Sequence, residues 1–183
     1  MSAQQHYEVK VVPYSSDWPK EFEKEKERLL EILAPHVVTI EHTGSTSIPN
    51  QDAKPIIDIY VAVHTLFDKQ FYENLLNRSG YRYIGAFNAG RHFFVKEHEG
   101  TRTHHLHIFP LEGFYERNEL LFRDYLRANP EFVKEYGELK RALAEQYHSD
   151  PDGYTRSKTA FIQHVVDLAR TERGLPLQNV WED

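Results

Sequence analysis

The 183-residue sequence contains no cysteine, one methionine and two tryptophans. Without cysteine, the chain forms no disulfide framework, no thiolate zinc site and no cysteine nucleophile. It also has no apolar run close to the ~20 residues that a bilayer-spanning helix needs. Its first residues do not combine a basic stretch with an apolar one, as a secretory signal peptide does. We therefore expect a cytoplasmic protein that does not act at a membrane.

Charge and length narrow the function further. The chain carries 28 acidic and 22 basic side chains and a formal net charge of −6, which opposes bulk binding to nucleic acid but allows a local basic pocket. The length suits one domain with a single core. The 11 histidines are the unusual feature. They indicate either a metal or acid–base site, or side chains scattered over the surface.

The order of the predicted elements indicates an α+β fold. Hydrophobic alternation and β-branched runs predict strands at 8–12, 37–42, 54–63, 81–84, 92–96 and 103–109. Helical periodicity predicts helices from residue 16 or 17 to 33, and at 68–76, 117–128, 132–147 and 152–173. Strands followed by helices predict a mixed β-sheet with a C-terminal helical layer. We predict one domain over 1–183, with a sheet-containing core over about 8–112, a helical part over about 115–173 and a tail over 174–183.

The first predicted helix has one apolar stripe and a run of charges. Phe22, Leu29, Leu30 and Leu33 are expected to be buried together. Glu25 and Arg28, with similar i,i+3 pairs beside them, are expected on the solvated side.

Small residues follow the strand predicted at 37–42. Gly44, Ser45, Thr46 and Ser47 form either an ordinary loop or a turn whose backbone N–H groups can approach a phosphate closely. The next strand begins with Lys54, a point charge for the same anion. Its alternation places Ile57, Ile59, Val61 and Val63 on one face, so Asp58 and Tyr60 point to the other. A carboxylate there can hold a divalent metal that neutralises phosphate charge.

These residues carry a resemblance to a known family. The runs Ile40–Pro49 and Ala53–Ile59 resemble the signature of the GrpB family, and Val12-Pro13-Tyr14 with Trp18-Pro19 match its N-terminal motif. Residues 102–107, 122–127 and 154–162 resemble its later motifs. The resemblance covers roughly Val9 to Asp167, with the motifs in the family's order.

The resemblance implies a nucleotidyltransferase-like fold. That superfamily has a hydrophobic-Gly-Ser turn that opens a helix, and an Asp-x-Asp/Glu pair on the next strand. Gly44-Ser45 and Asp58 match this pattern, but Tyr60 stands where a second metal-binding carboxylate is expected. Two-metal phosphoryl transfer needs shared carboxylates that hold the ions about 4 Å apart, and tyrosine replaces one poorly. Asn50 stands where the family more often has glycine. The match therefore supports the fold more than it supports nucleotidyl transfer.

A cluster of histidines lies on a later strand. His105 and His107 share a face about 7 Å apart, with His104 on the opposite face. Because the superfamily normally supplies a third carboxylate from a later strand, one of the two is expected in that place. Both can then bind one divalent ion, Mg, Mn or Zn, together with Asp58. The alternative is that they hydrogen-bond the sheet and line a polar cleft without metal.

A third group is basic. Arg91, Arg123, Arg156 and Lys158 are either ordinary surface residues or cations that converge on a triphosphate or another acidic group. Arg91 and Lys158 are the two we place in the substrate site. Tyr60 and Phe93 can stack on a base or belong to the core.

The sequence therefore predicts a protein that binds a nucleotide or another phosphorylated small molecule with a divalent metal. The cleft is expected to contain Gly44–Ser47, Lys54, Arg91 and Lys158 for the substrate and Asp58, His105 and His107 for the metal. Asp58 and His107 are the catalytic candidates for nucleotidyl or phosphoryl transfer. One alternative is a non-catalytic ligand-binding or adaptor module. The other is a metal-dependent hydrolase with a histidine base.

Overall fold

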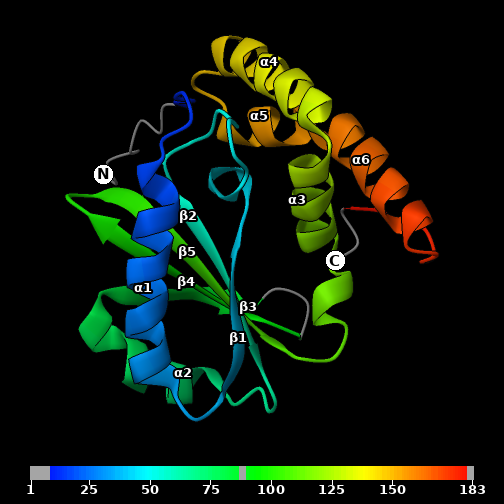
Figure 1. Cartoon of the computed structure of the whole chain (residues 1–183). Helices are drawn as coiled ribbons and strands as arrows, with labels where there is room; N and C mark the ends of the chain where they lie inside the picture. The colour runs from blue at the N-terminus through cyan, green and yellow to red at the C-terminus, as the bar shows by residue number, and fades with distance from the viewer. Residues whose placement is uncertain (1–8, 87–89, 181–183) are drawn as a thin grey trace.

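The structure is a computed structural model that describes residues 9–86 and 90–180, and it contains a five-stranded mixed sheet (Figure 1). The strand order is β1-β2-β5-β4-β3. Strands β2 and β5 run parallel, and all other neighbours are antiparallel. The strands are β1 (Val37–Thr43), β2 (Ile57–Val63), β3 (Tyr81–Ala86), β4 (His92–His98) and β5 (Thr101–Pro110). The predicted metal ligands therefore lie on two adjacent strands, Asp58 on β2 and the two histidines on β5.

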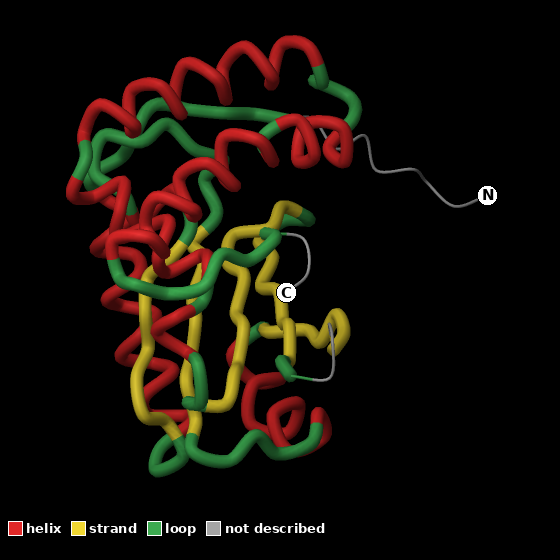
Figure 2. The backbone as a smooth tube through the Cα atoms, turned by 90° about the vertical axis from the view of Figure 1, so that its right-hand side faces the viewer, coloured by secondary structure: helices red, strands yellow, loops and turns green. Residues whose placement is uncertain are grey.

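Helices form two groups around this sheet. The helices α1 (Asp17–Leu33) and α2 (Lys69–Leu76) cover one of its faces. The others gather beyond the end of the sheet where β2 begins, as Figures 1 and 2 show from two sides. They are α3 (Asn118–Ala128), α4 (Pro130–Gln146), α5 (Pro151–Ser157) and α6 (Thr159–Glu172). The predicted α+β class, with a C-terminal helical layer, is confirmed.

Alternation along β2 divides its side chains as predicted. Ile57, Ile59, Val61 and Val63 join the main core under α1 and α2. On the other face, Tyr60 packs with Ala62, Phe109, Phe114 and Leu120 in a second apolar cluster. Asp58 lies on that second face, at the end of β2 nearest the helical layer. The period of two therefore fixes which face of the sheet carries the polar site.

Two predicted elements are wrong. The strand at 8–12 is reduced to one antiparallel bridge between Val12 and Ala53, because Pro13 offers no N–H to continue the ladder; Glu8 lies outside the described residues. The helix at 152–173 is divided into α5 and α6 at Lys158. There the Thr159 hydroxyl donates to the carbonyl of Arg156 at 2.5 Å and competes with the helical ladder.

The first helix begins at the predicted residue and buries Phe22, Leu29 and Leu33 of its predicted stripe, but Leu30 is exposed and Glu25 is buried instead. Leu30 is 41% exposed, whereas Glu25 is 3% exposed. Glu25 is buried because Lys96 on β4 donates to its carboxylate at 2.8 Å. Burial acts to raise the pKa of Glu25, but this hydrogen bond and the charge of Lys96 hold the pKa below its ordinary value. The charged pair therefore fastens α1 to the sheet.

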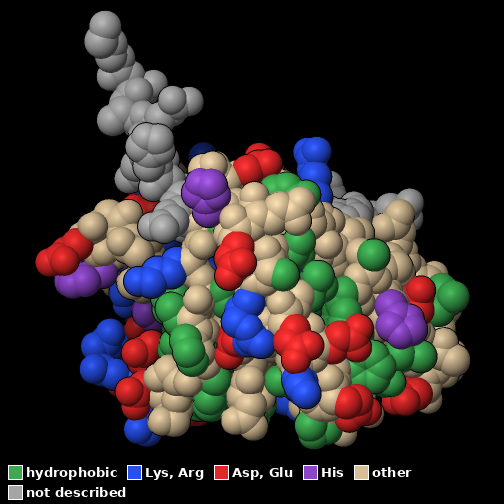
Figure 3. All heavy atoms as spheres, turned by 90° about the horizontal axis from the view of Figure 1, so that it is seen from above, with side chains coloured by type: hydrophobic (Ala, Val, Ile, Leu, Met, Phe, Trp, Pro, Cys, Tyr) green, Lys and Arg blue, Asp and Glu red, His purple; other side chains and the backbone are tan. Residues whose placement is uncertain are grey.

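The surface of the helical end mixes charges of both signs. Figure 3 views the molecule from that end, and acidic and basic side chains alternate with apolar ones across it. Within residues 9–86 and 90–180, no helix has the length and apolar character required to cross a membrane.

Candidate functional site

A tight turn at Gly44 starts the site. Gly44 follows the last residue of β1 with φ +66° and ψ −176°, a conformation that favours glycine, and the short 3₁₀ helix η1 (Ser45–Ser47) comes next. The Ser47 hydroxyl donates to the carbonyl of Gly44 at 2.6 Å, and the Thr46 hydroxyl donates to the carbonyl of Ile56 at 3.0 Å. These bonds fix the predicted turn against the start of β2. A Cβ atom at Gly44 would lie 2.8 Å from Cγ of Asp58, so the turn and the carboxylate are in close contact.

Asp58 and His105 meet across the parallel pair of strands. They are direct partners in the register of β2 and β5, and Nδ1 of His105 lies 3.0 Å from Oδ1 of Asp58. Their side chains are 29% and 22% exposed, so both can be reached from the cavity that they line. The structure thus brings together these two predicted residues and the Gly44 turn.

Three lysines from separate segments line the same cavity, which has a volume of about 160 Å³. Lys54 precedes β2, Lys140 belongs to α4, and Lys158 lies at the junction of α5 and α6. Lys140 donates to Oγ of Ser45 at 3.0 Å and also to the carbonyl of Asp52. The ammonium nitrogens of Lys54 and Lys158 lie 4.7 and 4.2 Å from the centre of the Tyr154 ring. We call this the lysine cavity; its lining is Ser45, Thr46, Lys54, Ile56, Asp58, His105, Lys140, Tyr154 and Lys158.

Burial and mutual repulsion shape the charges of these lysines. Burial, together with the charge of Lys54, lowers the pKa of Lys158 to about 8, although Asp58 opposes the change. Burial, with the charges of Lys158 and Arg141, lowers the pKa of Lys140 well below its ordinary value. Burial also lowers the pKa of Lys54. An anion in the cavity would offset both the desolvation and the repulsion.

His107 is not brought to this cavity. It pairs in register with Tyr60 rather than Asp58, and its ring stacks on Phe93 at 4.3 Å with an interplanar angle of 7°. Burial lowers the pKa of His107 well below its ordinary value, so the imidazole is neutral. The reason is that residues two apart share a face of a strand but lie about 7 Å apart along it. Among the described residues, no group of three or more His, Cys, Asp or Glu side chains is placed to hold a metal ion.

The predicted arginines also lie elsewhere. Arg91 lies 3.9 Å from the carboxylate of Glu119 and 5.9 Å from the ring of Phe109. Phe109 is four residues beyond His105 on β5, about 13 Å along the strand. Arg123 is buried and donates at 2.8 Å to both Glu41 and the carbonyl of His42. Arg156 is exposed on α5.

Sequence reasoning missed three residues of the lysine cavity, which are Ile56, Lys140 and Tyr154. Lys140 is 2% exposed and Tyr154 is 1% exposed. The signal for Lys140 was present, because it lies four residues after Tyr136 on the apolar face of the helix predicted at 132–147. A lysine on a buried helix face needs a partner or an anion. Tyr154 lies in the run 154–162, in which Lys158 was assigned to the substrate site but Tyr154 was assigned no role.

Comparison with known proteins places these motifs in a family. The model of the family described as GrpB protein matches residues 8–168. The glutamate-rich protein GrpB of Alkalihalophilus pseudofirmus is 39% identical over 165 residues, which make up 87% of this chain and 95% of that protein. YqkA of Bacillus subtilis is 37% identical over 163 residues, or 88% of this chain. The chain spans about half the length of that relative, 47%.

Solved structures give the corresponding fold. The crystal structure of the conserved protein GrpB from Enterococcus faecalis matches with a TM-score of 0.83 and 36% identity, over 90% of this chain and 99% of that one. The Cid1 poly(U) polymerase, in its MgGTP-bound structure, matches with a TM-score of 0.53 and 13% identity, over 81% of this chain and 50% of that one. At 13% identity, the similarity to Cid1 shows a shared fold and nothing about function. The nucleotidyltransferase-like fold implied by the sequence is confirmed.

Proposed function

The chain belongs to the GrpB family, and from its lysine cavity we propose that it binds a nucleotide or another phosphorylated small molecule. The observation that carries this proposal is the convergence of Lys54, Lys140 and Lys158 beside Ser45 and Asp58. Three partly desolvated ammonium groups around a serine hydroxyl match the charge and hydrogen-bonding needs of a phosphate.

The size of the cavity supports binding through the phosphate part of the ligand. Its volume of about 160 Å³ is below the ~300–1,000 Å³ of pockets that enclose a whole drug-sized ligand. The phosphate chain would lie among the lysines and against η1, and the remainder of the ligand would extend outward. The fixed turn at Gly44 supplies backbone close to that position, as the close approach of a phosphate requires.

A divalent metal fits this site only as a partner of the ligand. Asp58 offers one carboxylate and His105 one imidazole, while Tyr60 is 5% exposed in the apolar cluster and offers no second carboxylate. Mg²⁺ is commonly held by one or two carboxylates together with substrate phosphates. We propose that Asp58 supplies such a ligand to one ion, which would neutralise phosphate charge. The donor set does not fit a two-metal centre.

Three possibilities are compatible with binding. A non-catalytic ligand-binding or adaptor module is favoured by the burial of Tyr60, whose pKa is raised well above its ordinary value by burial and by Glu119. Nucleotidyl or phosphoryl transfer would rely on the lysines and Asp58 alone. A hydrolase would need a histidine base in the lysine cavity, a position that His105 occupies and His107 does not.

Calorimetric titration of ATP and GTP, each with and without Mg²⁺ or Mn²⁺, tests the proposal. We expect binding with the intact chain, and a loss of roughly tenfold or more in affinity for Lys158→Gln, since a charge-assisted contact to phosphate contributes about 1.5–3 kcal/mol. Lys24→Gln is the matched control, because Lys24 is an exposed lysine of α1. Equal affinity in the two variants, or no binding at millimolar nucleotide, would contradict the proposal.

A second measurement separates binding from chemistry. Asp58→Asn is expected to remove the part of the affinity that depends on the metal and to keep the part that depends on the lysines. Release of pyrophosphate or phosphate from a bound triphosphate, measured in the intact chain and in Asp58→Asn, then distinguishes transfer or hydrolysis from binding alone. Turnover that His105→Ala retains would exclude His105 as the base.

A further inference from the structure

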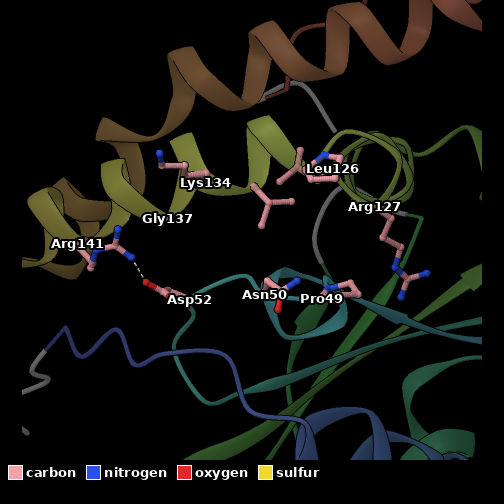
Figure 4. A pocket seen from close by; sticks show the side chains of 10 residues that line it. Pro49, Asn50, Asp52, Leu126, Arg127, Lys134, Gly137 and Arg141 are labelled. Atoms are coloured by element: carbon pink, nitrogen blue, oxygen red, sulfur yellow. Dashed lines mark hydrogen bonds and ion pairs between the residues drawn. The ribbon is translucent and has the colours of Figure 1, made fainter.

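A second, larger cavity is lined by the segment Pro49–Asp52 together with residues of α3 and α4 (Figure 4). Its volume is about 310 Å³, and its walls come from that segment, the end of α3 and one side of α4. Asn50 shapes the segment with φ +62°, a left-handed conformation that asparagine tolerates in place of the family's usual glycine. We call this space the α3–α4 cavity.

The walls of the α3–α4 cavity combine an apolar floor with a basic rim. Leu126 and Val133, 0% and 7% exposed, form the buried part of the floor. Arg127, Lys134 and Arg141 also line the cavity, with the single carboxylate of Asp52, and Figure 4 shows Arg127 and Arg141 at opposite ends of it. A site of this composition favours a molecule that carries a negative charge on an apolar body.

The rim is already partly fixed in position. Arg127 donates from Nε and Nη2 to the carbonyl of Ser47, at 3.0 and 2.7 Å, which holds its planar guanidinium; its Nη1 group donates to no other described residue. Arg141 forms an ion pair with the Asp52 carboxylate, and Figure 4 shows the two side chains pointing toward each other. Lys134 makes no hydrogen bond or ion pair within residues 9–86 and 90–180. The cavity therefore has one oriented cation, one unengaged cation and one cation held by an internal carboxylate.

We propose that the α3–α4 cavity is a second binding site, for a small organic anion in which a carboxylate, sulfonate or phosphate is attached to an aromatic or aliphatic body. The apolar body would contact Leu126 and Val133. The charged group would contact Lys134 and Arg127, and it competes with Asp52 for Arg141. Asp52 is thus an internal competitor of the ligand.

The two cavities share structural supports. The carbonyl of Asp52 accepts a hydrogen bond from Lys140, which also donates to Ser45 in the lysine cavity. Arg127 holds Ser47 in the same short helix η1. An anion in the α3–α4 cavity therefore contacts the residues that position η1, although it does not enter the lysine cavity. This proposal does not depend on the proposed function.

Titration calorimetry of the full chain with naphthalene-1-sulfonate, compared with inorganic sulfate, tests the second site. We expect the aryl sulfonate to bind more tightly than sulfate, because only the former buries apolar area on the floor. Lys134→Gln is expected to weaken binding by about two- to fivefold, the usual effect of one solvent-exposed charge. Asp52→Asn is expected to strengthen it by a similar factor. Lys24→Gln, on the distant helix α1, should leave the affinity unchanged.

Backbone amide shifts locate the probe. Shifts centred on Val133 and Gly137 are expected, and Lys158→Gln should leave the affinity for the aryl sulfonate unchanged even though it weakens nucleotide binding. Loss of sulfonate binding in Lys158→Gln would place the probe in the lysine cavity and overturn the proposal. Equal affinity in the intact chain, Lys134→Gln and Asp52→Asn, or no binding at millimolar probe, would overturn it as well.

Discussion

Gly44 lies directly against the carboxyl group of Asp58, so that a Cβ atom on residue 44 would come within 2.8 Å of Cγ of Asp58. Gly44→Ala must therefore move the carboxylate or the turn, and it also forces alanine into a backbone region with φ +66°. We expect a loss of about 1–3 kcal/mol in the free energy of unfolding, measured by urea denaturation.

Gly113→Ala is the control for Gly44→Ala. Gly113 also has a positive φ, +68°, but a Cβ there meets no atom within 4 Å. It should cost about 1 kcal/mol, the usual penalty of the left-handed region. In an Asp58→Ala background, the cost of Gly44→Ala should fall, because the carboxyl group is gone. An unchanged cost in that background would show that the contact with Asp58 is relieved without strain.

Anion binding in the lysine cavity should weaken at alkaline pH. Burial lowers the pKa of Lys158 to about 8, and a bound anion favours the protonated ammonium. The affinity is therefore complete below pH 8 and is lost as the pH rises through that value, by up to about tenfold per unit for one linked proton. ATP titrations between pH 7 and 9.5 measure this. Lys158→Arg stays charged and should give a flatter profile; identical profiles would exclude Lys158 as the titrating group.

The buried pair of Glu25 and Lys96 should matter for stability. Glu25→Ala leaves the Lys96 ammonium, 19% exposed, without its 2.8 Å partner. Breaking a buried ion pair costs about 3–5 kcal/mol, and the residual exposure of Lys96 places the expected loss near the lower end, about 3 kcal/mol. Glu27→Ala, an exposed position on the same helix, should change stability by less than about 0.5 kcal/mol. Similar losses for both variants in urea denaturation would contradict a special role of the pair.

His42 should make the protein sensitive to mild acid. Its ring stacks on Phe22 at 4.6 Å, and because the Thr46 hydroxyl donates to Ile56, Nε2 of His42 must donate to Thr46 at 3.0 Å. Burial, with the charges of Arg127 and Arg123, lowers the pKa of His42 to about 3. His42 is therefore protonated near pH 6.5 in the unfolded chain but only near pH 3 in the folded chain. The free energy of unfolding falls as the pH falls between these two values.

The effect of His42 can be separated from that of other groups. Between pH 7.5 and 5, the free energy of unfolding of the intact chain should fall by about 2 kcal/mol more than that of His42→Gln, since each pH unit below 6.5 contributes about 1.4 kcal/mol. Glutamine keeps a donor for Thr46 but does not titrate. Parallel pH profiles for the two proteins would show that His42 is protonated in the folded state.

The part of the site that lies on the sheet was predictable because it rests on short-range rules. The period of two placed Asp58 opposite the Ile57 face, and Gly44 followed a strand as a turn residue does. The same rule misled at His107, because sharing a face with His105 does not bring a side chain to the same point along the strand. There Tyr60 and Phe93, not Asp58, are the neighbours.

The part that depends on long-range packing was not predictable from periodicity. Lys140 reaches Ser45 across 95 residues of sequence, and Lys96 reaches Glu25 across 71. The pattern of α4 does not identify Ser45 as the partner of Lys140, and the pattern of α1 does not identify Lys96 as the partner of Glu25. A charged residue on an otherwise apolar helix face marks the existence of such a contact but not its other end.

The lysine cavity is built from segments that are far apart in the sequence, so its parts become available in a fixed order as the chain is synthesised and folds. Asp58 and His105 meet only when β5 has been made and has inserted beside β2, a non-local parallel pairing whose loop-closure entropy makes it slow. Lys140 and Lys158 follow later in the chain, on α4 and at the start of α6. An N-terminal fragment, including a chain still in synthesis, therefore has the turn and the carboxylate without the cations. Binding of an anion in the lysine cavity would report that the polypeptide has folded at least as far as Lys158, at the junction of α5 and α6.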